Sequence, residues 1–184
     1  MDAKQALRRA VHLKIAELAH RDEADAAIVH NVMTLPEWIE ADTVALTLSF
    51  GLEVDTRPLI EAAWQAGKVV HVPKVTTEGL TFHRLTSYED LEPGVMGILE
   101  PTTPSVEADV DLCIVPGRVF NRSGYRIGWG GGYYDRFLAT YAGKTLSIAY
   151  SVQILDDIPI EAHDIPVGMI VTEREWIRCL PFFS

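Results

Sequence analysis

The chain has 184 residues, of which 48% are hydrophobic and 23% charged, the usual balance of a soluble globular protein. No apolar run reaches the roughly 18–20 residues that a membrane helix needs. The net charge of −10 disfavours nonspecific nucleic-acid binding, because an acidic surface repels a polyanion. We therefore expect a single domain over residues 1–184, with no nucleic-acid or membrane partner.

The N-terminus alternates charged and apolar residues and has no apolar core typical of a secretory signal. The two cysteines, Cys113 and Cys179, indicate neither a disulfide framework nor a metal site. No two histidines have the spacing of a zinc site. Five of them look incidental: His12, His20, His30, His71 and His83. We expect a cytoplasmic protein in which Cys113 is a core residue.

The first third of the chain is predicted to contain three helices and a strand. Apolar spacing predicts an amphipathic helix over residues 2–19, and a second helix is predicted over 22–33. A β-branched and apolar run over 43–50 predicts a buried strand. The next helix is expected to begin at Asp55 or Thr56, either of which can act as its cap, and to end at the next glycine.

The rest of the chain continues this alternation. Proline and glycine break the acidic stretch 87–101 into turns, and a helix is predicted over 133–143. The remaining predicted strands span residues 68–73, 80–85, 111–117, 144–150 and 168–173.

Strands that are apolar on both faces and alternate with helices predict an α/β fold with a mainly parallel sheet covered by helices. Ligands of such sheets bind at the carboxyl ends of the strands. The segments "LSFGLEVD", "VPGRVF" and "RIGWGGGYYD" lie at or after such ends. We expect all three on one rim of the sheet.

The segment "RIGWGGGYYDR", from Arg126 to Arg136, has four glycines in five positions. A glycine turn that enters a helix presents unpaired backbone N–H groups to a phosphate. Arg126 could pair with phosphate oxygens, and Asp135 could hold Mg²⁺ beside them. Four arginines lie between residues 118 and 136, which favours a small anionic ligand.

Two known phosphate motifs are excluded for this segment. No Gly-Lys-Ser/Thr closes it, and Tyr133 occupies the third glycine position of the dinucleotide fingerprint. The alternative without a ligand is a tight turn in which Asp135 is a favourable first-turn acid, worth about 0.3–1 kcal/mol.

The segment "PGRVFNRSGYRIGWGGGYYDRFL" strongly resembles the signature of the 5-formyltetrahydrofolate cyclo-ligase family, also called 5,10-methenyltetrahydrofolate synthetases. The resemblance covers nearly the whole chain, since "KQALR", "LSFGLEVDT", "GILEP" and "IPIEAHDIPVGMIVTE" follow in the expected order. Two residues depart from the family pattern. Asn121 stands where aspartate is common, and Trp129 replaces a more usual Tyr, Phe or Arg.

The resemblance implies a three-layer α/β/α fold like that of ribose-phosphate isomerases and CoA transferases. It also implies an ATP- and Mg²⁺-dependent reaction on 5-formyltetrahydrofolate. The formyl oxygen is phosphorylated, the nitrogen at position 10 attacks the resulting iminium-like carbon, and phosphate leaves. The implied products are 5,10-methenyltetrahydrofolate, ADP and phosphate.

The resemblance also implies site residues. Arg126, Tyr133 and Asp135 are the expected catalytic residues, and Asp135 and Asp164 the expected metal ligands. The expected ATP-binding set comes from the first helix and the glycine segment: Lys4, Arg8, Arg126, Ile127, Gly128, Trp129, Gly130, Gly131, Gly132, Tyr133, Tyr134 and Asp135.

Some of these residues have plainer alternatives. Lys4 and Arg8 lie four apart on one helix face, which could simply be solvated. Asp164 could be a turn acid. Of the two tyrosines we expect one in the core and the other facing the ligand.

The folate residues implied by the resemblance lie in two segments. Phe50 is expected against the pterin ring and Asp55 on its ring nitrogens, with Glu53 nearby. Glu53 and Asp55 should point the same way if the segment is extended, although Asp55 could instead cap the following helix. The second segment, from Trp129 to Tyr133 (Trp129, Gly130, Gly131, Gly132 and Tyr133), lines the folate side.

Two other functions remain open at this stage. One is a non-catalytic nucleotide-binding or RNA-associated module on the same fold, which would show loss of the Lys/Arg/Asp set or a basic tail. The other is an ATP-using enzyme that acts on a different amide or carboxylate. Only assays with a panel of substrates would distinguish it from a cyclo-ligase. A monomer or weak homodimer is expected.

Overall fold

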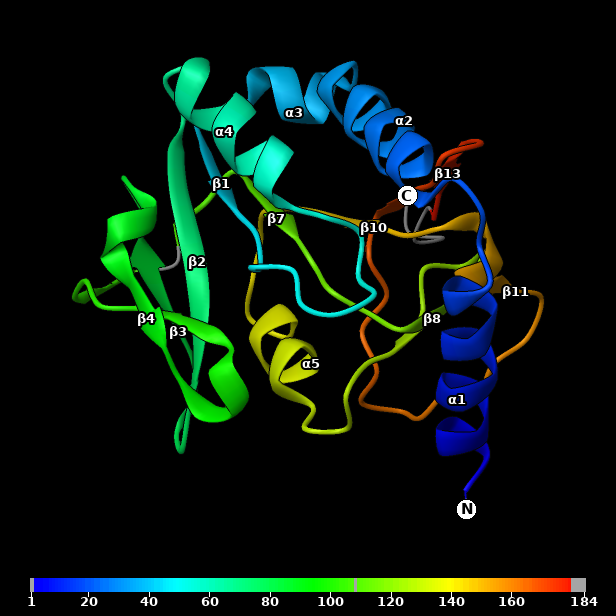
Figure 1. Cartoon of the computed structure of the whole chain (residues 1–184). Helices are drawn as coiled ribbons and strands as arrows, with labels where there is room; N and C mark the ends of the chain where they lie inside the picture. The colour runs from blue at the N-terminus through cyan, green and yellow to red at the C-terminus, as the bar shows by residue number, and fades with distance from the viewer. Residues whose placement is uncertain (1, 108, 180–184) are drawn as a thin grey trace.

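The computed structural model describes residues 2–107 and 109–179 and is shown in Figure 1. Its helices are α1 (Ala3–Ala16), α2 (Arg21–Met33), α3 (Pro36–Glu40), α4 (Arg57–Gln65) and α5 (Tyr133–Leu138). Three 3₁₀ turns are η1 (Tyr88–Asp90), η2 (Val95–Gly97) and η3 (Ser151–Gln153).

An eight-stranded sheet in the order β13-β12-β10-β7-β1-β2-β3-β6 forms the centre of the molecule. From β12 through to β2 neighbouring strands are parallel, and the outer strands β13, β3 and β6 are antiparallel. The predicted mainly parallel sheet is thus confirmed. The strands are β1 (Thr43–Ala45), β2 (Val69–Thr76), β3 (Gly79–Arg84), β6 (Ser105–Val106), β7 (Leu112–Ile114), β10 (Lys144–Ile148), β12 (Met169–Val171) and β13 (Trp176–Arg178).

The sheet has a hydrophobic core on each face, because successive strand residues point to opposite sides. Val44 and Leu46 pack in the core formed with α1 to α4, whereas Ala45 packs in the core formed with α5. Cys113 is buried in the second core, as predicted, and burial raises the pKa of its thiol to about 12. Helices therefore cover both faces, the expected three layers.

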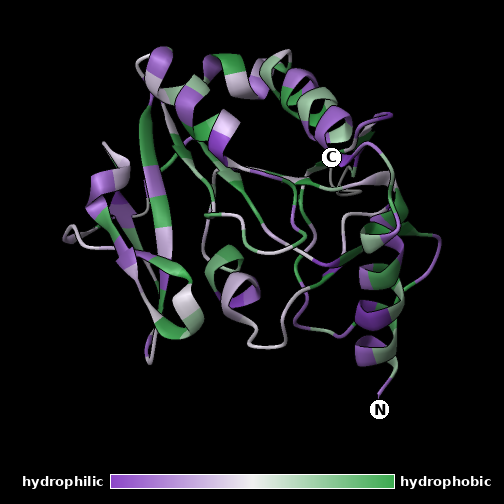
Figure 2. Ribbon diagram, viewed as in Figure 1, coloured by the Kyte–Doolittle hydropathy of each residue, from purple (hydrophilic) through white to green (hydrophobic). Residues whose placement is uncertain are grey.

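Helix α1 begins directly after a capping residue, Asp2. Asp2 Oδ1 accepts a hydrogen bond from the backbone N–H of Gln5 at 2.7 Å. Val11 and Ile15 are buried on the face that meets the core. Helix α2 buries only Ile28 and Val32 of its 13 residues, and Figure 2 shows hydrophobic and hydrophilic residues mixed along it.

Smaller elements complete the fold, and sequence patterns did not predict most of them. A three-stranded sheet and a two-stranded sheet lie outside the main one. The missed strands have two or three residues and, unlike β1, β7 and β12, do not lie within a longer apolar run, so no pattern marked them. The five-residue helix α3 and the strands β6 and β13 were missed as well. The additional strands are β4 (Leu91–Pro93), β5 (Leu99–Pro101), β8 (Val119–Asn121), β9 (Arg126–Ile127) and β11 (Ile154–Leu155).

Three predicted elements need correction. The strand expected over 43–50 ends at Ala45, and the acidic stretch 87–101 contains β4 and β5 as well as turns. The helix expected over 133–143 ends at Leu138, where the N–H groups of Thr140 and Tyr141 bond three residues back in a tight turn. α5 is thus one and a half turns long, too short for a strong helix dipole.

Across residues 2–107 and 109–179, no helix combines the length and the hydropathy needed to cross a membrane. The single-domain organisation and the relation to the ribose-phosphate isomerase and CoA transferase fold stay predictions.

Candidate active site

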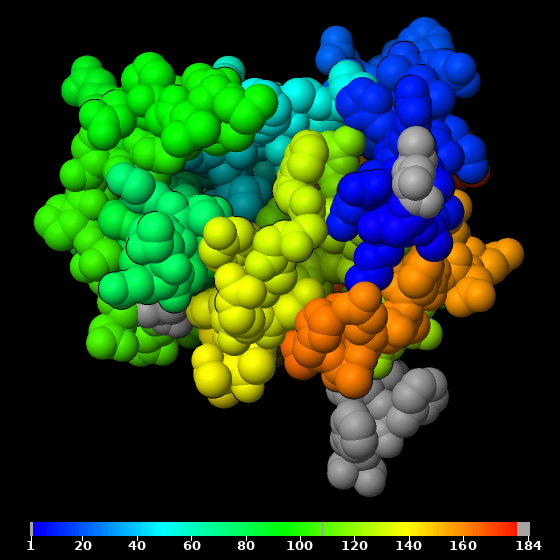
Figure 3. All heavy atoms as spheres, turned by 90° about the horizontal axis from the view of Figure 1, so that it is seen from below, coloured from blue at the N-terminus to red at the C-terminus, as the bar shows by residue number. Residues whose placement is uncertain are grey.

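A cleft of about 520 Å³ lies beside the glycine segment, between α1, the β2–β3 hairpin and the turn at residues 161–164. Figure 3 looks onto this face: the yellow-green glycine segment and α5 lie between the green hairpin and the blue start of α1, with the orange turn beside it. Every residue predicted to bind ATP lines this cleft, and so does Asp164. The structure thus gathers the predicted nucleotide set in one place.

The glycine segment owes its tight course to particular backbone angles. Gly130 and Gly132 have φ of 107° and 68°, which disfavour a side chain. At Gly131 a Cβ would lie 2.4 Å from the Tyr133 ring. Gly128 differs, because a Cβ there would meet nothing within 4 Å. The ligand-free fold therefore gives no steric reason for glycine at position 128.

Two arginines hold the carbonyls of this segment. Arg8 Nε donates to the Gly128 carbonyl at 2.6 Å, and Arg136 Nη1 donates to the Gly131 carbonyl at 2.9 Å. The Arg136 guanidinium also lies 4.8 Å from the centre of the Tyr133 ring. These contacts fix the course of the loop and place cationic groups at its edge.

Arg126 and Asp135 form a buried pair below the loop. Asp135 Oδ1 accepts from Arg126 Nη2 at 3.3 Å and from the Ile165 N–H at 3.0 Å. Arg126 Nη1 donates to the Ile165 carbonyl at 2.8 Å. Burial lowers the pKa of Arg126, and the neighbouring Asp135 carboxylate opposes that shift. In this geometry Arg126 orients Asp135; its direct contact with phosphate stays a prediction.

The turn that precedes β12 brings a second carboxylate to the cleft. Lys4 Nζ lies 3.4 Å from Glu161 Oε1 and 3.9 Å from Asp164 Oδ2. Asp164 Oδ2 also accepts from the Glu161 N–H at 2.8 Å, so the turn-acid alternative holds alongside the cleft position. One ligand atom each from Glu161, His163 and Asp164 lies within 4.8 Å of the others. Oxygen ligands of this kind suit Mg²⁺.

Both tyrosines line the cleft, and Tyr134 also belongs to the core side. Tyr134 packs against the second core, with its ring 6.4 Å from that of Phe137, and burial raises its pKa. This confirms the core half of the prediction. Tyr133 lines the cleft beneath Arg136, and its contact with a ligand stays a prediction.

The three predicted folate residues of the other segment do not share one pocket. Phe50 is 44% exposed and borders a separate hollow of about 210 Å³, with Tyr88 and Ile98 among its lining. Glu53 turns inward, and its Oε1 accepts from the Phe50 N–H at 2.8 Å. Burial raises the pKa of Glu53, while the Phe50 N–H and the Arg118 charge lower it.

The Asp55 carboxylate has different partners from that of Glu53. Its Oδ1 accepts from Ser49 Oγ at 3.3 Å and from the Arg57 N–H at 3.1 Å, as a residue at a helix start does. Glu53 and Asp55 were expected to point the same way only on an extended segment, and the segment is instead a turn in which the Glu53 N–H donates to the Phe50 carbonyl.

Sequence reasoning missed a contact beside the cleft, that of His12 with Arg118, whose guanidinium lies on the Trp129 ring. His12 is not incidental, since its Nδ1 lies 3.0 Å from Arg118 Nη2. Its position four residues after Arg8, which itself follows Lys4 by four, was the available signal. Asn121, the departure from the family pattern, accepts two backbone N–H bonds within the β8–β9 turn.

Known proteins are similar to this chain in sequence and in fold. The sequence model of the 5-formyltetrahydrofolate cyclo-ligase family matches residues 1–173. The chain belongs to this family of enzymes. A 5-formyltetrahydrofolate cyclo-ligase of Escherichia coli (strain K12) is 34% identical over 158 residues, which cover 79% of this chain and 87% of the relative. A probable 5-formyltetrahydrofolate cyclo-ligase of Schizosaccharomyces pombe is 31% identical, covering 95% of this chain and 97% of its own.

Solved structures agree with this assignment. The NMR structure of the Aquifex aeolicus 5,10-methenyltetrahydrofolate synthetase superposes with a TM-score of 0.86 at 35% identity, covering 100% of this chain and 96% of that protein. A 5,10-methenyltetrahydrofolate synthetase from Mycoplasma pneumoniae gives a TM-score of 0.75 at 25% identity, covering 94% and 99%. The predicted family, α/β fold and enzyme class are therefore confirmed.

Proposed function

We propose that the protein converts 5-formyltetrahydrofolate into 5,10-methenyltetrahydrofolate, with ATP as co-substrate and Mg²⁺ as the metal. Family membership supports the reaction and the use of ATP. The observation that carries the nucleotide and metal sites is the convergence on one cleft of two cationic side chains, the glycine segment and two carboxylates.

The reaction needs negative charge neutralised on the phosphoryl group as it moves to the formyl oxygen. Lys4 and Arg8 supply positive charge from one face of α1, next to the backbone of the glycine segment. Binding of the ATP phosphates there would draw Lys4 away from Glu161 and Asp164. Arg8 already contacts Gly128, so it needs the smaller movement.

Asp135 and Asp164 are the proposed metal ligands. Within the described residues the hydrogen bonds of the Asp135 carboxylate go to Oδ1, which leaves Oδ2 for a cation. Bound Mg²⁺ would neutralise charge on the phosphates. Arg126 keeps the Asp135 carboxylate oriented from below, and Tyr133 bounds the cleft.

The proposed reaction makes and breaks bonds in two steps. The formyl oxygen forms a bond to the γ-phosphorus of ATP, and ADP leaves. The nitrogen at position 10 then bonds to the formyl carbon and loses its proton, and phosphate departs with the former formyl oxygen. The residues proposed to hold the folate are Phe50, Glu53 and Asp55 on one side and Trp129, Gly130, Gly131, Gly132 and Tyr133 on the other.

A direct assay tests this proposal. Purified protein given 5-formyltetrahydrofolate, ATP and Mg²⁺ should generate the near-UV absorbance of the methenyl product, and omission of ATP should abolish it. A folded protein that yields no such absorbance would contradict the proposed reaction. The expectations of a monomer or weak homodimer, of a cytoplasmic location and of no nucleic-acid or membrane partner stay predictions.

A further inference from the structure

Arg118 lies behind the glycine segment and is fixed by its own backbone. Its N–H donates to the Ile127 carbonyl at 2.7 Å, and its carbonyl accepts from Gln153 Nε2 at 3.0 Å. The residue is 8% exposed. Its side chain therefore starts from a rigid point one strand away from the cleft.

The Arg118 guanidinium stacks on an exposed aromatic ring. It lies 4.3 Å from the centre of the Trp129 ring, within the range of a strong cation–π contact. Its Nη2 meets His12 Nδ1 on α1 at 3.0 Å. Trp129 itself is 63% exposed, so the guanidinium covers one face while much of the ring stays accessible.

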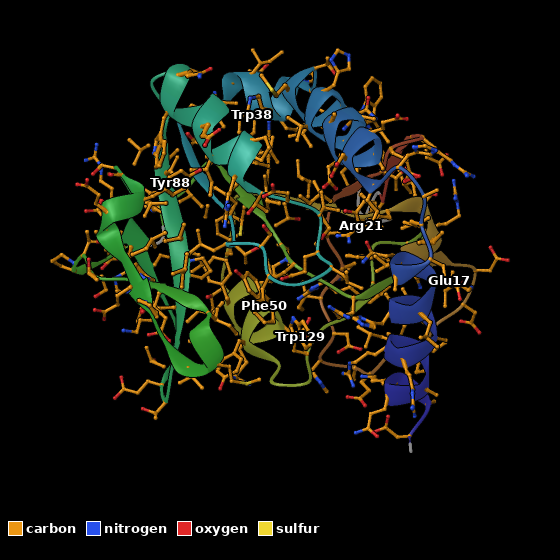
Figure 4. All side chains as sticks on the ribbon, in the orientation of Figure 1. Glu17, Arg21, Trp38, Phe50, Tyr88 and Trp129 are labelled. Atoms are coloured by element: carbon orange, nitrogen blue, oxygen red, sulfur yellow. The ribbon has the colours of Figure 1, made fainter. Side chains whose placement is uncertain are left out.

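The hydrogen bonds that fix the loop backbone do not hold the side chain of Trp129. It stands between Gly128 and Gly130, the residues with the widest backbone freedom. Arg8 holds the Gly128 carbonyl, and Arg118 holds the ring. Figure 4 labels Trp129 beside α5, in the middle of the view.

The fold alone gives no reason for a charge at this position. Within the described part of the chain Arg118 forms no ion pair, and burial lowers its pKa. The Glu53 carboxylate raises that pKa from beyond ion-pair distance. A buried cation without a close counter-charge is costly to a fold. An apolar residue at this position would destabilise the fold less, which indicates that the charge serves another purpose than stability.

We propose that Arg118 is a positioning residue that holds Trp129 as a platform at the cleft, with the face opposite the guanidinium left for a planar ring of the substrate. This inference rests on the proposed function for the identity of the substrate, a reduced folate. It links three elements, since Arg118 touches α1 through His12, the glycine segment through Trp129, and lies near the turn that carries Glu53.

The contact is tested first without any assay of activity. The chain has four tryptophans, whose indole N–H groups give separate NMR signals, and Trp129→Phe identifies that of Trp129. Arg118→Met should shift and sharpen the Trp129 signal and leave the other three in place. Arg118→Lys should give an intermediate change. Arg122→Met, which removes an exposed arginine of the β8–β9 turn, should leave the Trp129 signal unchanged.

The consequence for function is tested by kinetics on variants shown by thermal melting to be folded. Arg118→Met should raise KM for 5-formyltetrahydrofolate about 2- to 30-fold, the range of a partly buried cation–π contact, with a much smaller change in kcat or in KM for ATP. Arg118→Lys should recover part of the loss. In a double-mutant cycle with Trp129→Leu, the two effects should be strongly non-additive.

An unmoved Trp129 signal in folded Arg118→Met would overturn the contact. A moved signal with unchanged KM for the folate, or with additive effects in the cycle, would overturn the positioning role. If the unaltered protein forms no methenyl product, the proposed function fails by itself, and the NMR comparison still decides the contact.

Discussion

The nucleotide side and the folate side of the site are built in different ways. The residues predicted to bind ATP come from one continuous segment and one helix face, and all line the same cleft. Phe50 and Glu53 border separate hollows, and Asp55 bonds the start of α4. The glycines of residues 126–135 line the cleft with their backbone, so the course of the chain alone places them there. Phe50, Glu53 and Asp55 differ because their side chains matter, and the hydrogen bonds of the turn hold the Glu53 and Asp55 side chains on different partners.

The two sides also differ in burial. The Arg126 and Asp135 side chains are 4% and 18% exposed, whereas Phe50 is 44% exposed. Removal of a partner from a buried pair affects the fold as well as the chemistry. We therefore expect substitutions on the nucleotide side to change both stability and activity. Those at Phe50 should mainly change substrate binding.

The largest effect is expected from Asp135→Asn. Loss of the carboxylate charge removes a proposed Mg²⁺ ligand and should lower kcat at least about 100-fold, the loss typical for a group that stabilises transition-state charge. It should also lower Tm, because Arg126 keeps no counter-charge. Asp157→Asn, an exposed matched control, should change neither value. Near-normal turnover in Asp135→Asn would refute the metal assignment.

Two glycines separate the needs of the fold from those of the ligand. Gly124 has a φ of 90°, and a Cβ there would lie 2.4 Å from the Val167 carbonyl oxygen, so Gly124→Ala should lower Tm strongly. At Gly128 a Cβ has room, and Gly128→Ala should leave Tm unchanged or slightly raised. It should nevertheless weaken ATP binding, measured by calorimetry. Unaltered affinity would show that phosphate does not approach Gly128.

Lys4→Met tests the cationic face of α1. Loss of a charged hydrogen bond to phosphate should raise KM for ATP about tenfold. KM for the folate should change little. The exposed Lys14→Met on the same helix is the control, and equal effects of the two substitutions would argue for a merely solvated face.

The smallest effect is a pH dependence of stability on the folate side. Burial raises the pKa of Glu53 above its ordinary value of 4.5, so the folded protein binds this proton more tightly than the unfolded chain. The Glu53 contribution to the free energy of unfolding should therefore fall as pH rises from about 4.5 through the raised pKa. Glu53→Gln removes this fall and keeps the oxygen that accepts from Phe50.

Denaturant unfolding of both proteins at about pH 5 and about pH 8 measures the effect. The stability gained by Glu53→Gln should be larger at the higher pH. Glu78→Gln, at an exposed turn, should show no such trend. A gain that is equal at both pH values would contradict the raised pKa.

Sequence reasoning succeeded where a long pattern existed. The i, i+4 spacing of Lys4 and Arg8 placed both on one face of α1, and that face lines the cleft together with the glycine segment. The close approach of a ligand to the glycine backbone stays a prediction. Sequence reasoning failed for contacts made by tertiary structure. Arg118 is 106 residues away from His12, and no local pattern links them. The course of residues 50–56 depends on hydrogen bonds within a turn, which alternation cannot show.

Calorimetric titration of ATP into the protein, with and without Mg²⁺, tests the central claim most directly. We expect saturable heat when Mg²⁺ is present. The Asp135→Asn variant, titrated at a temperature at which the variant is folded, should lose most of that heat. Absence of heat with the unaltered protein, or equal heat with the variant, would contradict the assignment of this cleft to the nucleotide.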